Sequence, residues 1–273
     1  MPMNIFRRAW VRYVLRRYPI GHDLWENATD RLPVLRGLSS VEKAHLRELS
    51  TLFRYEKNII GAQGFEVTET MRVQVAATAC LPVLYLGARL FSPWREVVIY
   101  AGAFRVSRDE IDGMGIVHHQ DRVLSGESWE RGPVILSWQD IEQDNRAGYQ
   151  GHNVIIHEIA HKLDMLDGSA NGMPPLHAAM PVPPWTDAFS RAYDELNRRL
   201  EHDHPVCVDP YAATSPAEFF AVFSEYFFCA PDIVQTHFSD VFRQLRLYYR
   251  QDPLSRLRAD ETAAQPMQEA AVR

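Results

Sequence analysis

The sequence is poor in cysteine, lacks a surplus of positive charge and contains no long apolar run. Three cysteines, Cys80, Cys207 and Cys229, occur among 273 residues without a paired spacing. Such a set argues against a disulfide framework or a thiolate zinc site, so we expect a reducing, cytoplasmic location. The net charge of −6 argues against direct nucleic-acid binding, because binding domains usually carry a basic surplus. No segment approaches the roughly 18 apolar residues of a transmembrane helix, so we expect none.

Acidic residues are absent from residues 1–18, although this segment carries five arginines. They are Arg7, Arg8, Arg12, Arg16 and Arg17. Two interpretations stay open: a helix that packs on the domain or frays from it, and an amphipathic helix that touches a membrane surface or an acidic partner. The arginines interrupt every apolar run and no small-residue cleavage site follows, so we do not expect a signal peptide.

The remaining composition is that of a folded domain, with 46% hydrophobic and 23% charged residues. Residue periodicity and helix start and stop signals predict helices at about 40–57, 68–82, 152–166, 185–201, 216–229 and 232–250. Short β-branched and aromatic runs predict strands at about 96–100, 115–119 and 133–138. The fold class that follows is α+β, a mostly helical single domain with a small sheet.

The two ends of the chain differ in composition from its middle. Ser39, with Glu42 three residues later, is a capping-box pattern that opens the first predicted helix of the domain. We therefore expect a basic N-terminal segment at 1–38 and one domain at 39–257. Residues 258–273 are rich in Ala, Glu and Gln and are predicted to form a disordered tail.

One stretch, His157-Glu158-Ile159-Ala160-His161, carries a His-Glu-x-x-His pattern inside a run with helical periodicity. Two histidines one turn apart project from the same helical face, and zinc binds imidazole nitrogen readily. Glu158 follows the first histidine, close to a metal without having to bind it. The composition of the chain gives about a 3% probability of one accidental match, so the surrounding residues have to decide.

A hydrolytic zinc keeps one coordination position open, so two histidines need one further protein ligand. Position 167 is Asp167, which excludes the third histidine of a metzincin. Glu218 and Glu225 share one face of the predicted 216–229 helix, where apolar neighbours make an uncompensated carboxylate costly. Ser215-Pro216-Ala217-Glu218 is also a capping-box pattern. These residues leave Glu218 open as a metal ligand or a helix cap, with Glu225 as the other candidate ligand.

Several stretches together resemble the Mlc titration factor A family over about residues 60–255. They are Gln63-Gly64-Phe65-Glu66, Cys80-Leu81-Pro82-Val83-Leu84, Ser125-Gly126-Glu127-Ser128-Trp129-Glu130-Arg131-Gly132-Pro133, the eight residues from His157 to Asp164, and Tyr211 to Phe228. The resemblance implies a gluzincin-type zinc metallopeptidase with one zinc ion, a zincin-like His-Glu-x-x-His helix and aminopeptidase activity on short peptides. It makes 39–257 a metallopeptidase domain.

The resemblance also implies roles for individual residues. His157, His161 and Glu218 bind zinc, and metal-bound water activated by Glu158 attacks the peptide carbonyl. Tyr211 reaches the oxyanion of the substrate. The family binds the Mlc repressor, so the alternative function is a regulatory protein that sequesters an Mlc-like transcription repressor, with zinc mainly structural.

Two further acids keep alternative roles. Asp164, one turn after His161, is predicted either to orient a ligand imidazole through its second nitrogen or to hold the following loop. Glu225 is predicted either to lie behind the metal ligands or to form an ion pair with the last helix.

Overall fold

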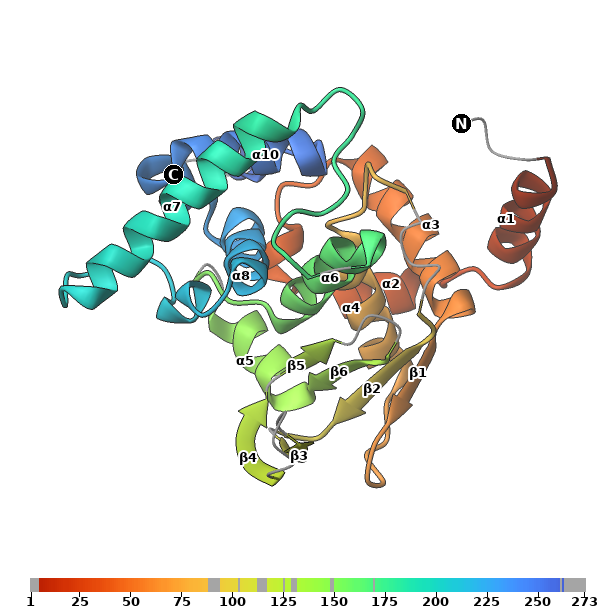
Figure 1. The fold of residues 1–273 in the computed structure, drawn as a ribbon. Helices are drawn as coiled ribbons and strands as arrows, with labels where there is room; N and C mark the ends of the chain where they lie inside the picture. The colour runs from red at the N-terminus through yellow and green to blue at the C-terminus, as the bar shows by residue number, and fades with distance from the viewer. Residues whose placement is uncertain are drawn as a thin grey trace, which may run out of the picture.

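The computed structural model describes residues 5–87, 94–102, 104–111, 117–124, 126–128, 132–147, 150–168, 170–260 and 262. Helices make up most of this chain and pack with one small sheet into a single domain (Figure 1). The labelled α-helices of the described part are α1 Ile5–Arg17, α2 His22–Thr29, α3 Ser40–Glu56, α4 Glu69–Cys80, α5 Trp138–Ala147, α6 Val154–Asp164, α7 Val182–Glu201, α8 Pro216–Cys229, α9 Pro231–His237 and α10 Ser239–Tyr249, and a further helical stretch covers 253–260. Three short 3₁₀ helices are η1 Pro33–Leu35, η3 Met165–Asp167 and η4 Pro210–Ala213.

The capping box predicted before the helix of residues 40–57 is confirmed. The Ser39 hydroxyl accepts a hydrogen bond from the Glu42 amide, and the Glu42 carboxylate accepts one of 2.9 Å from the Ser39 amide. The chain leaves this helix after Glu56, close to the predicted end at 57. It enters β1 (Asn58–Gly61) almost at once, since Lys57 already has an extended backbone.

The sheet has four strands in the order β1-β2-β6-β5. β2 (Glu96–Tyr100) pairs in parallel with both β1 and β6 (Val134–Ser137), whereas the short edge strand β5 (Gly126–Ser128) runs antiparallel to β6. Strands β3 (Phe104–Ile111) and β4 (Val117–Leu124) form a separate antiparallel pair. The predicted strands at 96–100 and 133–138 are confirmed. The one at 115–119 lies in β4 from residue 117 on and outside the described residues before it.

Alternate residues of the central strands point into the core and form an apolar face. The buried members are Ile59, Val97, Ile99, Val134 and Leu136. They are apolar and alternate with half-exposed or exposed positions, as expected for a sheet covered on one face. Helix α6 packs against β5 and β6, so the edge of the sheet borders the helix that carries the histidines.

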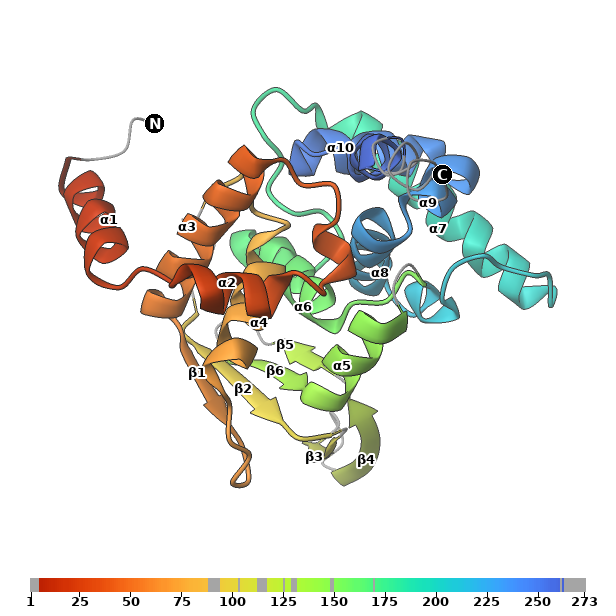
Figure 2. The same cartoon turned by 180° about the vertical axis from the view of Figure 1, so that it is seen from behind.

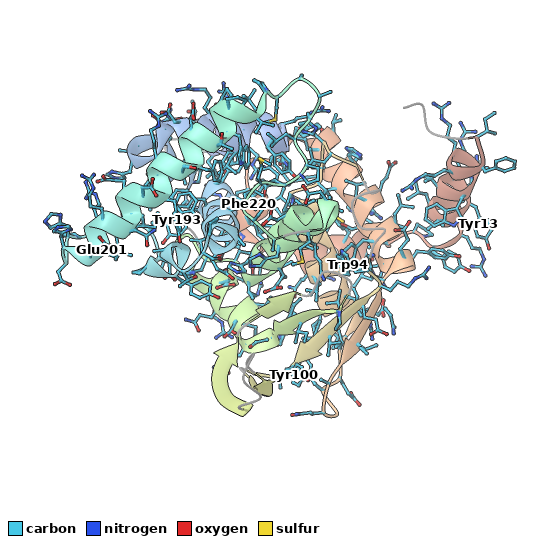
Figure 3. The ribbon with its side chains drawn as sticks, in the orientation of Figure 1. Tyr13, Trp94, Tyr100, Tyr193, Glu201 and Phe220 are labelled. Atoms are coloured by element: carbon cyan, nitrogen blue, oxygen red, sulfur yellow. The ribbon has the colours of Figure 1, made fainter. Side chains whose placement is uncertain are left out.

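Helix α8 lies in the centre of the helical layer, and its aromatic residues fix its position. Phe219, Phe220, Phe223, Phe227 and Phe228 are at most 1% exposed. They make ring contacts with α7, α9–α10 and one another, and Phe220 lies at the middle of the fold (Figure 3). Large buried rings resist displacement because interiors are close-packed. The polar residues of α8 therefore have fixed directions.

The helix predicted at 232–250 is wrong in one respect, because it is two helices. Phe238 leaves the helical backbone region, with φ −138° and ψ 51°, between α9 and α10. Its ring meets Phe223 of α8 edge to face, with 4.8 Å between centroids. The apolar residues of this segment recur with a helical period throughout, but the packing of Phe238 against Phe223 interrupts the helix. Helix α7 also begins three residues before the predicted start at 185.

Both ends of the described chain pack on the domain. Ile20, Trp25 and Leu35 belong to the same hydrophobic core as the sheet and α8. Residues 253–260 are helical and Arg36 forms a 3.0 Å ion pair with Asp260, so ordered chain continues past the predicted start of the tail at 258. Residues 263–273 lie outside the described part. The segment boundaries 1–38, 39–257 and 258–273 otherwise remain a prediction. None of the helices in the described residues combines the length and apolar character needed to cross a bilayer.

Candidate metal centre

Helix α6 places the two histidines on one face because its other faces are anchored. Asn153 caps the helix, with its side-chain oxygen accepting a 3.0 Å hydrogen bond from the Ile156 amide. Ile156, Ile159 and Leu163 are buried in the core. The 3.6-residue period then turns positions 157 and 161 toward α8.

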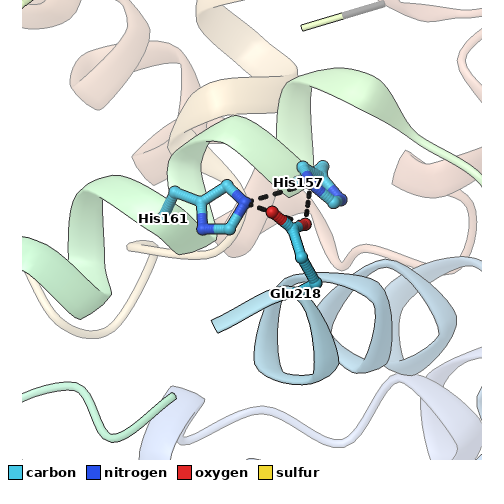
Figure 4. A group of neighbouring side chains, drawn as sticks. All are labelled: His157, His161 and Glu218. Atoms are coloured by element: carbon cyan, nitrogen blue, oxygen red, sulfur yellow. Dashed lines mark hydrogen bonds and ion pairs between the residues drawn. The ribbon is translucent and has the colours of Figure 1, made fainter. Parts of the chain in front are cut away.

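His157, His161 and Glu218 meet at one point between α6 and α8 (Figure 4). The Nε2 atoms of the two histidines lie 3.1 Å apart. One carboxylate oxygen of Glu218 lies 3.1 Å from Nε2 of His157 and 3.2 Å from Nε2 of His161. Three donor atoms thus form a nearly equilateral triangle.

The size of this triangle fits a zinc ion. Bonds of about 2.0–2.1 Å to nitrogen and oxygen in a tetrahedral site put the ligand atoms about 3.3 Å apart. The observed separations of 3.1 and 3.2 Å are close to this value. Two imidazole nitrogens and a carboxylate oxygen are also the donor set that zinc accepts, with a fourth position left for water or substrate.

The two interpretations of Glu218 apply to different parts of the residue. Its backbone amide donates a 3.2 Å hydrogen bond to the Ser215 hydroxyl, which is the N-cap of α8. Its carboxylate does not complete the capping box but lies against the histidines. The cap therefore sets the direction of the first turn, and this direction aims the carboxylate at α6.

Charge in the cluster favours a cation. Burial raises the pKa of Glu218, but the hydrogen bonds and charges of His157 and His161 outweigh burial and hold the pKa far below its ordinary range. Burial lowers the pKa of His157, yet the charge of Glu225 and hydrogen bonds to Glu218 and Glu225 raise it well above the usual value. Three carboxylates surround two imidazoles here, so the local field stabilises positive charge.

Glu225 contacts His157 on the side of the ring that faces away from the cluster, in agreement with the first of its two predicted roles. Its side chain is buried, and one oxygen lies 2.7 Å from Nδ1 of His157. The other oxygen accepts a 2.6 Å hydrogen bond from the amide of Asn153, the N-cap of α6. The Glu225 carboxylate thus orients the imidazole ring of His157 and links α8 to the start of α6. If Nδ1 donates its hydrogen to Glu225, a bound metal ion would take the lone pair of Nε2.

Substitution of Glu225 is expected to weaken zinc binding. Glu225→Gln offers one acceptor oxygen in place of two, so it can serve His157 or the Asn153 amide but not both. We expect a loss of about 10–100-fold in zinc affinity, as is typical of partners that orient ligand imidazoles. Competition with a chromophoric chelator measures this. Asp232→Asn, which changes an exposed acid on α9, is the control, and equal affinity in both variants would contradict the role.

Glu158 is buried beside the cluster on the same helix. It is 1% exposed, and its Oε2 atom has no hydrogen-bond partner among the described residues. Burial raises the pKa of its carboxyl group, while the histidines lower it and Glu218 raises it further. A carboxylate that is desolvated and lacks a partner binds a proton more readily than one in water.

Tyr211 lies next to His157 on the solvent-exposed side of the cluster. The short helix η4 begins after Asp209, whose carboxylate accepts a 2.8 Å hydrogen bond from the Tyr211 amide. The Tyr211 ring is 47% exposed and its centroid lies 6.2 Å from that of His157. The tyrosine therefore borders the cluster from the solvent side.

Asp164 serves the following loop, the second of its two predicted roles. It is fully buried, and one carboxylate oxygen accepts a 2.8 Å hydrogen bond from the Gly172 amide. Within the described chain, no hydrogen bond joins Asp164 to His161. Gly172 has a φ of 79°, and a Cβ there would collide with the backbone of Pro216. This contact packs the loop against the start of α8, so Asp164 supports the site indirectly.

Asp144 of α5 anchors the first turn of α6, a contact that sequence reasoning missed. Its carboxylate accepts a 2.9 Å hydrogen bond from the Val154 amide. Burial raises its pKa from 3.8 to about 6, against the effect of this hydrogen bond. The sequence gives little indication of this role, because an acidic residue in a helix with many charged residues usually faces water.

The raised pKa of Asp144 predicts a pH-dependent stability. The folded protein keeps the proton up to about pH 6, whereas the unfolded chain releases it near 3.8. The stabilisation is therefore complete below pH 3.8 and is lost as pH rises through about 6. Asp144→Asn cannot ionise and keeps an acceptor oxygen. Relative to wild type, we expect it to gain about 1–2 kcal/mol between about pH 4 and pH 7, after allowance for partial solvation.

Urea unfolding at the two pH values measures this difference. Asp187→Asn, at an exposed position on α7, provides the control. A difference between wild type and Asp144→Asn that does not change with pH would show that the raised pKa has no thermodynamic effect.

The fold and the cluster define a class of protein. Two histidines one turn apart on a helix, joined by a glutamate from a second helix, form the donor set of His₂Glu metallohydrolases. Residues 6–250 match the family described as Glucose-regulated metallo-peptidase M90, and the chain belongs to this metallopeptidase family. The match begins well before residue 60, so it includes most of α1 and all of α2 and α3.

Curated relatives agree with this family. The chain is 41% identical over 242 residues to Mlc titration factor A of Cronobacter sakazakii, covering 88% of this chain and 90% of that protein. It is 39% identical over 236 residues to Mlc titration factor A of Klebsiella pneumoniae, covering 86% and 88% of the two chains. It is also 39% identical over 242 residues to the protein of that name from Escherichia fergusonii, covering 88% and 90%. The resemblance inferred from the sequence is confirmed.

Proposed function

We propose that this protein is a zinc-dependent metallopeptidase that acts as an aminopeptidase on short peptides. The observation that carries the proposal is the convergence of His157 Nε2, His161 Nε2 and a Glu218 oxygen within 3.2 Å of one another. A family of metallopeptidases supports the reaction class. The spacing and donor types support zinc as the ion.

The proposed roles follow from position. His157, His161 and Glu218 hold one zinc ion, and Glu225 fixes the His157 ring. When bound, zinc supplies a positive charge that polarises the peptide carbonyl and acidifies water. Because these ligands come from two helices that are packed into the core, they keep their geometry while substrate enters.

Glu158 is the proposed general base and acid. Its buried, desolvated carboxylate takes a proton from the water that attacks the peptide carbonyl and returns it to the leaving amine. Tyr211 borders the same point from the solvent side, so its hydroxyl is the proposed donor to the oxyanion. Each residue then acts on a different atom of the scissile bond.

Peptides with free and blocked amino termini test the aminopeptidase proposal. We expect hydrolysis of short peptides with a free α-amine, loss of turnover after chelation and recovery with zinc. N-acetylation should abolish cleavage of the first peptide bond, because an aminopeptidase uses the charged amine to position its substrate. Equal cleavage of acetylated peptides would leave a metallopeptidase but exclude an aminopeptidase.

A second candidate function rests on the name of the relatives. Proteins called Mlc titration factor A are 38–41% identical to this chain, and the name indicates a protein that titrates the Mlc repressor. We propose binding of an Mlc-like repressor as the alternative, in which zinc mainly braces α6 against α8. A pull-down with Glu158→Gln separates the two functions. Undiminished capture by the inactive variant would make binding independent of catalysis, whereas absence of capture by wild type would remove the alternative.

A further inference from the structure

Helix α1 is set apart from the rest of the molecule. In both opposite views it lies at one end, with α3 between it and the helices α6 and α8 (Figure 1 and Figure 2). It packs on α3 through its inner face, where Val14 is buried and the Trp10 ring lies 5.9 Å from that of Tyr55. Its outer face therefore points away from the metal cluster.

The outer face of α1 is strongly basic. Arg8, Arg12, Arg16 and Arg17 are exposed, and the helix contains no acid. Among the residues that the structure describes, no ion pair joins an acid to any arginine of α1. The whole chain has a net charge of −6, so this positive face stands against an acidic remainder. A group of exposed cations on one short helix that carries no acid attracts an anionic surface.

The exposed half of α1 also carries large apolar side chains beside the arginines. Ile5 and Phe6, at the first turn of α1, are 79% and 83% exposed, and Tyr13 is 54% exposed. Figure 3 shows Tyr13 on this helix, far from the labelled core residues Trp94 and Phe220. Tyr18 and Tyr55 lie beside it, with 5.0 Å between their ring centroids. A helix that only faced water would gain nothing from these apolar and aromatic groups.

We propose that α1 docks this protein on an anionic lipid bilayer. Arginines would contact the headgroups, Ile5 and Phe6 at the helix tip would enter the acyl boundary, and Tyr13 with its neighbouring rings would lie at the interface. Basic and apolar side chains together on the exposed half of one helix match a lipid surface, which offers both charge and hydrocarbon. An acidic protein surface would satisfy the arginines but would not bury the exposed apolar side chains of Ile5 and Phe6.

This orientation keeps the metal cluster accessible. Because α3 separates α1 from α6 and α8, a bilayer that contacts the outer face of α1 does not cover the histidines. Docking is thus independent of the proposed peptidase activity. It would bring the protein to a membrane surface without a spanning segment.

Vesicle sedimentation of the full chain tests the proposal. Wild type should bind phosphatidylcholine vesicles that contain about a third phosphatidylserine, release in high salt and ignore pure phosphatidylcholine. The triple variant Arg8→Gln, Arg12→Gln, Arg16→Gln should lower the partition coefficient at least about tenfold, since each arginine near an anionic surface strengthens binding roughly fivefold. Ile5→Ser with Phe6→Ser should lower it about tenfold at unchanged net charge.

A matched control removes three exposed arginines from the other end of the molecule: Arg191→Gln, Arg198→Gln and Arg243→Gln. This variant has the same net charge as the α1 triple variant and should bind like wild type within about twofold. Peptide hydrolysis and circular dichroism show whether each variant is folded.

Three results would overturn the proposal. One is the absence of wild-type binding to phosphatidylserine vesicles, and another is an equal loss of binding in the control variant. The third is retention of wild type on a polyglutamate matrix, dependent on the α1 arginines, without any vesicle binding. That result would assign α1 to an acidic protein partner instead.

Discussion

Glu158→Gln is expected to keep zinc at wild-type stoichiometry and to lower peptide hydrolysis by about 10²–10⁴-fold. Glutamine has nearly the shape of glutamate, so helix α6 and the positions of His157 and His161 should not change. It cannot accept a proton from the attacking water or return one to the leaving amine. The loss should therefore fall on kcat, with little effect on KM, because substrate binding does not use this carboxylate.

Metal analysis and steady-state kinetics on the same preparation measure both quantities. The matched control is Glu201→Gln, which changes an exposed glutamate at the end of α7, far from α6 (Figure 3). It should have wild-type turnover. Unchanged hydrolysis by Glu158→Gln would exclude this residue as the base. A variant without zinc would mean that the buried carboxylate acts on the metal cluster itself.

Glu218→Ala is expected to lose stoichiometric zinc and with it all measurable peptidase activity. It removes one of the three donor atoms, so we expect the affinity to fall by more than about 100-fold, beyond the range of outer partners such as Glu225. The α8 cap should survive, because the Ser215 hydroxyl accepts from the backbone amide at position 218. Chelator competition measures the affinity, and thermal unfolding without metal measures the fold.

Ser215→Ala provides the reciprocal control for Glu218. It removes the cap and keeps the carboxylate, so it should cost about 1 kcal/mol of stability while zinc affinity stays within a few-fold of wild type. The two variants thus separate the two parts of Glu218. Stoichiometric zinc in Glu218→Ala, or zinc loss in Ser215→Ala equal to that in Glu218→Ala, would return this residue to a capping role alone.

Local features of the fold could be predicted because their causes lie within a few residues. The Ser39–Glu42 capping box, helix α4 within the predicted range 68–82 and strand β2 at residues 96–100 each depend on neighbouring side chains. The same is true of the helical phase that puts His157 and His161 on one face. Propensity, capping and periodicity act over a single turn or strand, so they can be recognised from residues that are close together in the sequence.

Long-range features could not be predicted in the same way. The parallel order of β1, β2 and β6 and the edge strand β5 depend on pairing across many residues, and the sequence pattern only indicated a small sheet. The break at Phe238 arises because its ring packs on Phe223. Asp144 contacts the start of α6 from a helix whose composition suggests a solvated face.

For the site, the sequence by itself determined the paired histidines, the glutamate between them and two candidate carboxylates on one helix. Glu218 and Glu225 are seven residues apart and share a face, so their order along the chain cannot distinguish their positions. Only the packing of α8 on α6 decided that Glu218 meets both Nε2 atoms and Glu225 meets Nδ1 of His157. The physical reason is that interhelical register is set by the buried aromatic residues of α8, which contact elements distant in sequence.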